Sequence, residues 1–520
     1  MVSEVRFLGV VLDSRLDGSS QIRALISRGR RISHIIAFLA GTRWGAHPQC
    51  LLTLYRSLFR GSIEYGSGIF EYRNKGELFL TLQRLQYKLI RISLGYRMST
   101  PINVMLVKAK EMPLYLRFRL LIQKYLTKNA SLKFNPVIDS FWDLQDSLIG
   151  FTKYNYALRN IPGFRVFASM DSTFSHIHRS ISVPAFSHNF KAMICRPNIK
   201  FLEFGVGDRD SVLEVNAKFN EFCQSHYVGY VSFYTDGSKV NSADVPVGSS
   251  VFSPELKFII KHKLPPVTSI FSAEAWGISE AISIILQFNC YKSVIFTDSQ
   301  SVLDILSSPA LNHPNYIIAT IKSKLEQAAR LDLEIVFIWV PSHKGILGNE
   351  TADRLAKEAT GDGLRPYFKV PYTDLFAKIK DSHVLRFETY LQGKAALTGS
   401  HYFTHYHLAR RYPWYYHKQL NRQTIVLLNR LRSNHYNLNY SLFRKNIVSS
   451  GGCTCGNPRQ DMNHVILYCL LYRDRALFLI TFIQSQYHRL FNDITPLLHD
   501  PPAKLCRLLV AFFKSVQLFP

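Results

Sequence analysis

The spacing of apolar residues along the chain changes near residue 227. Before that point, residues 1–134 predict helices after one opening strand at Val5–Leu12, and the clearest helix is Leu82–Leu94, where apolar residues recur every three or four positions. Residues 135–227 are interrupted by prolines and contain no long periodic segment. We therefore expect a mainly helical N-terminal region followed by a connector with short elements.

From residue 227 onward, short runs rich in aromatic and β-branched residues predict strands, and longer amphipathic runs predict helices. The expected strands are Tyr227–Thr235, Val247–Phe252, Lys257–His262, Ser293–Thr297 and Leu333–Val340, and the expected helices are Ser272–Gln287, Ser299–Leu306, Asn315–Leu331 and Asn349–Glu358. Three antiparallel strands followed by alternating strands and helices predict an α/β domain. Its mixed five-stranded sheet would carry helices on both faces.

This pattern divides the chain into four parts. We expect a basic helical region at 1–134, a connector at 135–227, an α/β domain at 228–360 and a second mainly helical, basic region at 361–520. A chain of 520 residues is long enough for several domains, each with its own core.

The charge is distributed unevenly over these parts. The chain has a formal net charge of +26, with 22 basic and 7 acidic residues in 1–134 but 11 basic and 13 acidic residues in 228–360. One helix places Arg84, Lys88 and Arg91 on a shared face. Such an excess indicates a polyanionic partner, either nucleic acid or an acidic membrane surface, and the alternative is that these are solvated basic faces.

The sequence also indicates the cellular compartment in which we expect the protein. No uncharged apolar run is long enough to span a bilayer, and the N-terminus has no basic region followed by an apolar signal core. Eight cysteines in 520 residues are sparse, which favours a reducing compartment over a disulfide framework. We expect an intracellular protein, nuclear or cytoplasmic, with no membrane partner, and the sequence does not identify protein partners.

Four acidic residues of the α/β domain stand where a metal site would need them. Asp236 and Asp298 each follow an apolar strand, Glu274 lies in the first turn of the helix expected from Ser272, and Asp353 lies in the last expected helix. Each of them alone would more often be a cap or a turn residue. Phosphodiester hydrolysis with two Mg²⁺ ions requires several carboxylates gathered at strand ends and helix starts.

The order of the surrounding motifs resembles the ribonuclease H family of cells and retroelements. The fragments are Thr-Asp-Gly-Ser, Ala-Glu-Ala, Thr-Asp-Ser-Gln and Pro-Ser-His-Lys-Gly-Ile-Leu-Gly-Asn-Glu-Thr-Ala-Asp, and their acids are separated by 38, 24 and 55 residues. The resemblance implies cleavage of the RNA strand of an RNA/DNA hybrid. Asp236, Glu274, Asp298 and Asp353 would hold two Mg²⁺ ions, which Mn²⁺ could replace, and His343 would assist proton transfer or product departure.

The same resemblance implies substrate contacts. Gly237, Ser238, Gln300 and Asn349 occupy positions where the family touches the minor groove, in which the 2′-hydroxyl distinguishes RNA from DNA. An alternative interpretation is a domesticated nucleic-acid-binding protein without catalysis. A transposase or integrase on the same fold is disfavoured by the order Asp, Glu, Asp, Asp with a histidine loop before the last acid.

Residues 5–134 resemble the region after the palm in non-LTR retrotransposon reverse transcriptases. The resemblance rests on Phe7–Asp13, Leu54–Leu58 with Tyr65-Gly66, and Lys110–Leu114. No two aspartates are adjacent in the chain, whereas reverse transcriptase requires an aromatic-x-Asp-Asp turn. The chain therefore resembles the C-terminal part of such a protein, and polymerase activity is not expected.

Near the other end, three cysteines and a histidine form a C-x-C-x8-H-x4-C pattern. The residues are Cys453, Cys455, His464 and Cys469. Three thiolates and an imidazole are a complete tetrahedral set for a structural Zn²⁺ ion, and the alternative is that the cysteines are reduced and bind no metal. With zinc bound, this segment would stabilise a small basic domain that holds nucleic acid.

Overall fold

The chain forms two compact units that are both discontinuous in sequence. This computed structural model describes residues 3–14, 18–41, 44–69, 76–150, 162–170, 177, 196–202, 211–240, 242, 244–308, 313–407, 412–487 and 492–518. The first unit combines Met1–Ile122, Asn160–Gly163 and His383–Pro520, and the second combines Gln123–Arg159 and Phe164–Ser382.

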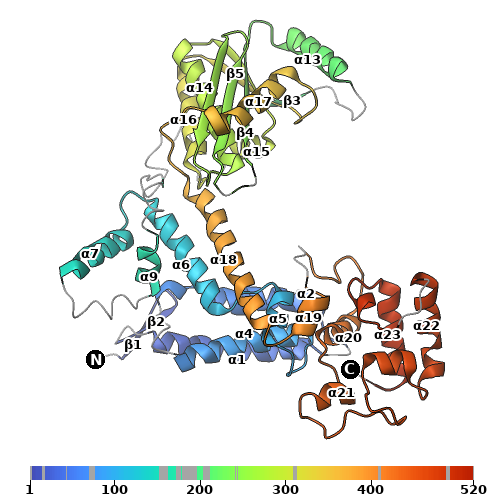
Figure 1. Cartoon of the computed structure of the whole chain (residues 1–520). Helices are drawn as coiled ribbons and strands as arrows, with labels where there is room; N and C mark the ends of the chain where they lie inside the picture. Colours follow the sequence, from blue (N-terminus) through green and yellow to red (C-terminus); the bar gives the residue numbers. More distant parts are fainter. Residues whose placement is uncertain are drawn as a thin grey trace. The chain divides into compact units, whose positions relative to one another are not determined.

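The second unit contains the α/β domain (Figure 1). Its strands are β3 (Asn198–Phe201), β4 (Val231–Ser238), β5 (Val247–Ser253), β6 (Phe258–Leu264), β7 (Lys292–Thr297) and β8 (Glu334–Trp339). The helices of the second unit are α7 (Pro136–Gly150), α13 (Val212–His226), α14 (Ile270–Phe288), α15 (Gln300–Ser307), α16 (Tyr316–Arg330) and α17 (Leu347–Asp362), and α9 (Pro162–Ala168) has residues in both units.

The six strands form one mixed sheet in the order β3-β8-β7-β4-β5-β6. The three pairings from β3 to β4 are parallel, and β4-β5 and β5-β6 are antiparallel. The five expected strands are confirmed, but the expected strand count was one too low because β3 adds an edge strand. This strand has four residues and no buried side chain, so it carries no apolar alternation that the sequence could reveal.

Alternate side chains of the central strands enter two separate cores. Phe233, Ile295 and Phe337 pack with residues of α14, α15 and α16 on one face. Their neighbours Tyr234 and Phe296 pack with residues of α13 and α17 on the other face. Because successive residues of a strand point to opposite faces, the sheet has helices on both sides, which confirms the expected α/β fold class of the ribonuclease H type.

Two glycines allow α17 to lie close to the sheet. A Cβ atom on Gly248 of β5 would stand 1.8 Å from the carbonyl oxygen of Ala356, and a Cβ atom on Gly348 would stand 2.3 Å from the ring of Tyr234. Any larger residue would push the helix outward. The close packing fixes the position of Asp353 on α17 relative to the end of β4.

The first unit is mainly helical. Its main elements are β1 (Glu4–Phe7), β2 (Val10–Asp13), α1 (Ser19–Leu39), α2 (Pro48–Leu54), α3 (Gly61–Glu64), α4 (Gly76–Leu94), α5 (Ile102–Ala109), α19 (Ser400–His405), α20 (Arg422–Ser433), α21 (Asn439–Phe443), α22 (Arg473–Tyr487) and α23 (Ala503–Ser515). Helices α6 (Leu114–Ala130) and α18 (Tyr372–Ala395) contribute residues to both units.

The start of the chain differs from its prediction as a single strand. Residues Val5–Leu12 are two antiparallel strands, β1 and β2, because Leu8 and Gly9 adopt left-handed backbone conformations and reverse the chain. The predicted helix at Leu82–Leu94 is confirmed as the C-terminal part of α4. Among the helices that the structure describes, none combines the length and apolar character needed to cross a bilayer.

A buried arginine joins the two ends of the first unit. Arg422, at the start of α20, is 4% exposed, and its guanidinium donates hydrogen bonds to backbone carbonyls at the C-terminal ends of α1 and α4 and to the carbonyl of Ala46, just before α2. The acceptors are Gly41 (3.0 Å), Ala40 (3.1 Å), Ile92 (2.9 Å), Ser93 (2.8 Å) and Ala46 (3.3 Å). Burial lowers the pKa of this side chain to about 10, so it stays charged at neutral pH and interacts favourably with both helix ends.

Candidate active site

Asp236 lies at the centre of the candidate site. It stands near the end of β4, is 6% exposed, and accepts a hydrogen bond at Oδ1 from the backbone N–H of Gly237 (2.7 Å). Across the sheet it pairs with Ser250 of β5, whose hydroxyl donates to the carbonyl of Ala352 in α17 (2.7 Å). This bond fixes the backbone directly before Asp353 against the strand that neighbours Asp236.

Asp298 is placed by the parallel pairing in the middle of the sheet. It directly follows β7, whose last residue Thr297 pairs with Thr235 on one side and Trp339 on the other. The indole N–H of Trp339 donates to the backbone carbonyl of Asp298 (3.1 Å). The carboxyl ends of two adjacent parallel strands therefore bring Asp236 and Asp298 to the same edge, where open α/β sheets bind ligands.

Glu274 reaches this edge from helix α14. The helix begins at Ile270, earlier than expected, so Glu274 lies in the second turn and not in the first. A Cβ atom on Gly237 would stand 2.9 Å from the backbone nitrogen of Glu274, so the glycine allows the helix to pack against the strand end. The Glu274 Oε2 atom accepts a hydrogen bond of 2.5 Å from the hydroxyl of Ser299.

The charges of three acids act on Asp236, although no three of these four acids offer ligand atoms within 4.8 Å of one another in the described part of the chain. Burial, together with the negative charges of Asp298, Asp353 and Glu274, raises the pKa of Asp236 to about 8, although the hydrogen bond from the Gly237 N–H opposes this shift. Burial also raises the pKa of Glu274 to about 7, with a further contribution from Asp298 and an opposing one from Ser299. Without cations, the charged forms of these buried carboxylates are disfavoured. The site is therefore suited to hard cations, which would neutralise this negative charge.

These shifts predict how stability depends on pH in the absence of divalent metal. An acid whose pKa is about 8 when folded and near 3.8 when unfolded binds more protons in the folded state between those values. The free energy of unfolding therefore falls as the pH rises through this window. We expect the metal-free Asp236→Asn variant to melt at a higher temperature than the wild type, by several degrees more at pH 8 than at pH 5.

Thermal unfolding of both proteins over this pH range, with no Mg²⁺ or Mn²⁺ added, measures that difference. A constant difference from pH 5 to pH 8 would contradict the electrostatic picture.

Asp353 differs from the other acids because it already has a cationic neighbour. Lys357, one turn later on α17, donates to Asp353 Oδ2 (2.6 Å), and this contact raises the lysine pKa. The Nδ1 atom of His343 lies 4.0 Å from the same oxygen, and His343, Glu350 and Asp353 offer ligand atoms within 4.8 Å of one another. His343 is exposed on its loop and has a left-handed backbone conformation.

The four residues expected to contact substrate are placed differently from one another. Gln300 is exposed at the start of α15, and Gly237 and Ser238 are half-buried at the end of β4. Asn349 is 3% exposed, and its side-chain oxygen has no hydrogen-bond partner among the described residues. Gln300 and Ser238 are thus accessible from solvent, whereas Asn349 of α17 is buried.

Sequence reasoning missed three residues that hold the candidate site in place. Ser299 donates to Glu274 and Lys357 donates to Asp353. Ser299 lies within the Thr-Asp-Ser-Gln motif, and Lys357 lies one helical turn after the motif that ends at Asp353. The third, Asp374 of α18, accepts hydrogen bonds from the backbone N–H of Ser269 (2.9 Å), the Ser269 hydroxyl (2.9 Å) and the Ser272 hydroxyl (3.0 Å). Ser269 is the N-cap of α14, so Asp374 fixes the start of the helix that carries Glu274.

Replacing Asp374 should therefore loosen the start of α14 and disturb the position of Glu274, although Asp374 is not one of the four candidate metal ligands. Asp374 is 5% exposed, and Asp374→Ala removes the acceptor of three donors, of which the Ser272 hydroxyl is buried and the two of Ser269 are partly buried, which costs about 2–3 kcal/mol of stability. We expect a lower melting temperature and lower hybrid cleavage. Asp381→Ala, at an exposed position of the same helix, is the matched control and should change neither value. Equal behaviour of the two variants would show that Asp374 does not position α14.

The Cys/His residues predicted near the C-terminus are also brought together, in the first unit. Cys453, Cys455, His464 and Cys469 offer ligand atoms within 4.8 Å of one another. The Sγ atoms of Cys453 and Cys469 are 3.8 Å apart, and Cys455 Sγ is 3.2 Å from His464 Nε2. A sulfur separation of 3.8 Å is too long for a disulfide, but it is the edge of a tetrahedron with Zn–S bonds of about 2.3 Å. The donor set therefore fits a zinc ion.

Comparison with known families agrees with the α/β domain. The RNase H family model matches residues 229–361. The match contains all four acids and His343. It supports an RNase H domain that binds or hydrolyses RNA/DNA hybrids within this chain.

Proposed function

We propose that the RNase H domain is an endonuclease that cleaves the RNA strand of RNA/DNA hybrids with two divalent metal ions. The observation that carries this proposal is the placement of Asp236 and Asp298 at the ends of adjacent parallel strands, together with Glu274 and Asp353, whose charges also raise the pKa of Asp236. Asp236 and Glu274 each accept a hydrogen bond, yet their pKa values are still raised to about 8 and about 7, which suits a site completed by cations.

The donor set fits Mg²⁺, with Mn²⁺ as a substitute, because all four groups offer carboxylate oxygens at one edge of the sheet. When bound, the ions would lower the pKa of water and stabilise charge on the leaving oxygen. Asp236 would contact both ions, Glu274 and Asp353 would complete their coordination, and Asp298 would ligate one ion and help orient the attacking water.

In the proposed reaction, the water oxygen bonds to phosphorus as the bond from phosphorus to the 3′ oxygen breaks. The 3′ oxygen takes up a proton, so the products are a 3′-hydroxyl and a 5′-phosphate. His343 lies beside Asp353 on an exposed loop, where it can move a proton or help the product leave.

Selectivity for RNA would come from contacts in the wide minor groove of the hybrid. Ser238 and Gln300 are accessible beside the acids, and Gly237 permits close approach of the backbone. The enclosed Asn349 would need a small movement of α17 to reach substrate. The basic parts of the chain supply the excess positive charge that holds phosphate.

We also propose that the Cys/His cluster holds a structural zinc ion and that the chain derives from a retroelement protein. The support for the second point is the order of a basic helical region, an RNase H domain and a Cys/His cluster, together with the N-terminal motifs that resemble a reverse transcriptase.

The direct test incubates the full chain with end-labelled RNA/DNA hybrid, double-stranded RNA and double-stranded DNA. Only the RNA of the hybrid should be cut, and only with Mg²⁺ or Mn²⁺ added. Mg²⁺ should be omitted in the control rather than chelated, because a chelator would also remove zinc from the Cys/His cluster. Hybrid binding without cleavage at any metal concentration would favour the alternative function, a nucleic-acid-binding protein that has lost catalysis.

A further inference from the structure

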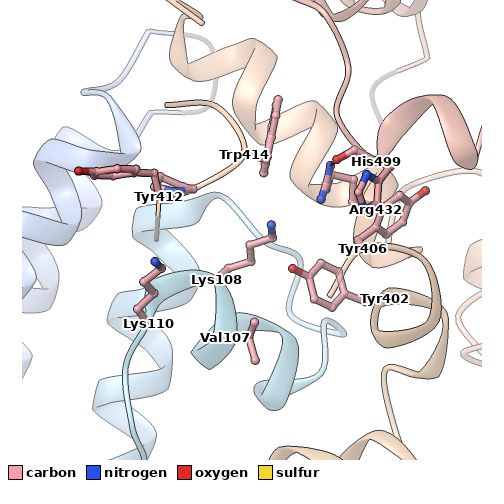
Figure 2. A pocket seen from close by; sticks show the side chains of 10 residues that line it. Val107, Lys108, Lys110, Tyr402, Tyr406, Tyr412, Trp414, Arg432 and His499 are labelled. Carbon is pink, nitrogen blue, oxygen red and sulfur yellow. Dashed lines mark hydrogen bonds between the residues drawn. The ribbon is translucent and has the colours of Figure 1, made fainter. Parts of the chain in front are cut away.

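Helix α13 and a pocket of the first unit both lie outside the residues that the RNase H family model matches. The pocket is lined by Lys108, Tyr402, Tyr406 and Arg432, among other residues (Figure 2). Arg432 donates hydrogen bonds to backbone carbonyls of the same unit, and its guanidinium lies over aromatic rings. These contacts account for its place in the core of the first unit. Helix α13, in contrast, contacts the loop that carries His343 of the candidate site.

Apolar side chains hold α13 against the sheet of the RNase H domain. Val215 and Phe219 are buried in the core that also contains Tyr234, Phe296 and Ile346. The rings of Phe219 and Phe296 have centroids 5.0 Å apart. A capping box stabilises the first turn of the helix. Helix α13 therefore has a defined position relative to β4, β7 and the loop before α17.

One polar side chain of α13, Asn216, bonds to the loop that follows His343. Its Nδ2 atom donates to the backbone carbonyl of Gly345, and its Oδ1 atom accepts from the backbone N–H of Leu347 (3.0 Å). Gly345 has a left-handed backbone, and a Cβ atom there would stand 3.0 Å from Val212 Cγ2. Both ends of one amide are thus used by a loop that lies 129 positions later in the chain.

Asn216 also supplies a helix cap that the loop itself lacks. Helix α17 begins at Leu347, and the first N–H groups of a helix have no partner within it. The residue at the N-cap position, Ile346, is buried and makes no side-chain cap bond. The amide oxygen of Asn216 provides an acceptor for the Leu347 N–H from a neighbouring helix. It therefore stabilises the end of the His343 loop together with the start of the helix that carries Asp353.

The position of His343 depends on the backbone of this loop. Its side chain is 66% exposed, and its Nδ1 atom lies 4.0 Å from Asp353 Oδ2, which is longer than a hydrogen bond. The backbone N–H of Gly345, two residues later, donates to Glu350 Oε1 (3.2 Å). The loop is therefore held from α17 on one side and from α13 on the other.

We propose that α13 is a positioning element of the RNase H site and that Asn216 holds the loop in the conformation that places His343 beside Asp353. In the described part of the chain, Asn216 bonds to none of the four acids, so it acts through the loop. This inference rests on the proposed function, because it uses the role proposed there for His343. It also extends the functional unit beyond the matched residues 229–361.

Hydrogen exchange of backbone amides tests the contact without substrate. In Asn216→Ala the Leu347 amide loses its acceptor, so it should exchange at least about tenfold faster than in the wild type, while the amides of α14 should be unchanged. Asn220→Ala, at an exposed position one turn later on α13, is the matched control and should leave the loop unchanged. Equal exchange of Leu347 in the wild type and Asn216→Ala would overturn the proposal.

The kinetics of hybrid cleavage by the full chain test whether the contact acts through His343. Asn216→Ala should lower kcat at least about fivefold and change KM less than about twofold, because the imidazole loses its position while the substrate contacts remain. In a His343→Ala background the same substitution should change kcat less than about twofold, because no imidazole remains to be positioned. A loss of equal size in both backgrounds would show a merely structural role and would overturn the proposal.

Asn216→Asp provides a second test if Asn216→Ala melts early. Aspartate keeps the acceptor for the Leu347 N–H but loses the donor to the Gly345 carbonyl, so its kcat should lie between those of the wild type and Asn216→Ala. A wild-type kcat in Asn216→Asp and in Asn216→Ala would overturn the proposal. Failure of the proposed function has a different signature: the wild type would not cleave hybrid, whereas the Leu347 amide would still exchange faster in Asn216→Ala.

Discussion

Asp236→Asn is expected to lower the rate of hybrid cleavage by at least about a thousandfold. Asparagine keeps the size of the side chain but is neutral and offers one oxygen, so it cannot hold two cations. Asp236 is the acid whose pKa each of the other three carboxylates raises, and it occupies the shared position at the end of β4. The measurement is the initial rate of cleavage of labelled hybrid in saturating Mg²⁺, together with hybrid affinity.

The structure supplies a control that separates lost chemistry from lost folding. Because the substitution removes charge repulsion, the metal-free variant should melt at a higher temperature than the wild type while it is inactive. Asp304→Asn, at an exposed position of α15, should leave both the rate and the melting temperature unchanged. Cleavage by Asp236→Asn above a tenth of the wild-type rate would exclude the proposed site.

The second large effect is expected at the Cys/His cluster. Cys469→Ser should reduce the zinc content from one ion per chain to none, and it should destabilise the first unit by several kcal/mol because metal binding is coupled to folding. Cys469 is 3% exposed, and its backbone N–H donates to the carbonyl of His464, so the ligand loop and the metal would support each other.

Elemental analysis and thermal unfolding with and without a chelator measure these effects. Cys50→Ser is the matched control, since Cys50 is an exposed thiol in the same unit and lies outside the cluster. Protein purified without zinc, whose melting temperature does not respond to added zinc, would show that the cluster consists of reduced cysteines only.

The sequence was most informative where function depends on local structure. Asp236 and Asp298 could be placed at one sheet edge because each follows a short apolar strand, and the ends of adjacent parallel strands must meet. The cysteine spacing similarly limits Cys453 and Cys455 to one loop. In these cases a few neighbouring residues determine the position of the side chain.

Long-range features could not be predicted in this way. Strand β3 pairs with β8 across more than a hundred residues of chain, and Asp374 bonds to Ser269 from a different helix. The pocket combines Lys108 with Arg432, which are 324 positions apart. Such contacts are determined by the packing of the whole unit, and no local pattern records them.

The bonds of Arg422 have a consequence for synthesis. The carbonyls of α1 and α4 that it satisfies belong to the first part of the chain, whereas Arg422 follows the intervening second unit, residues 123–382. At ~5–20 residues per second, a ribosome needs roughly 13–50 s to translate that interval. During this time the carbonyls at the ends of α1 and α4 cannot receive these bonds, because Arg422 has not yet been synthesised.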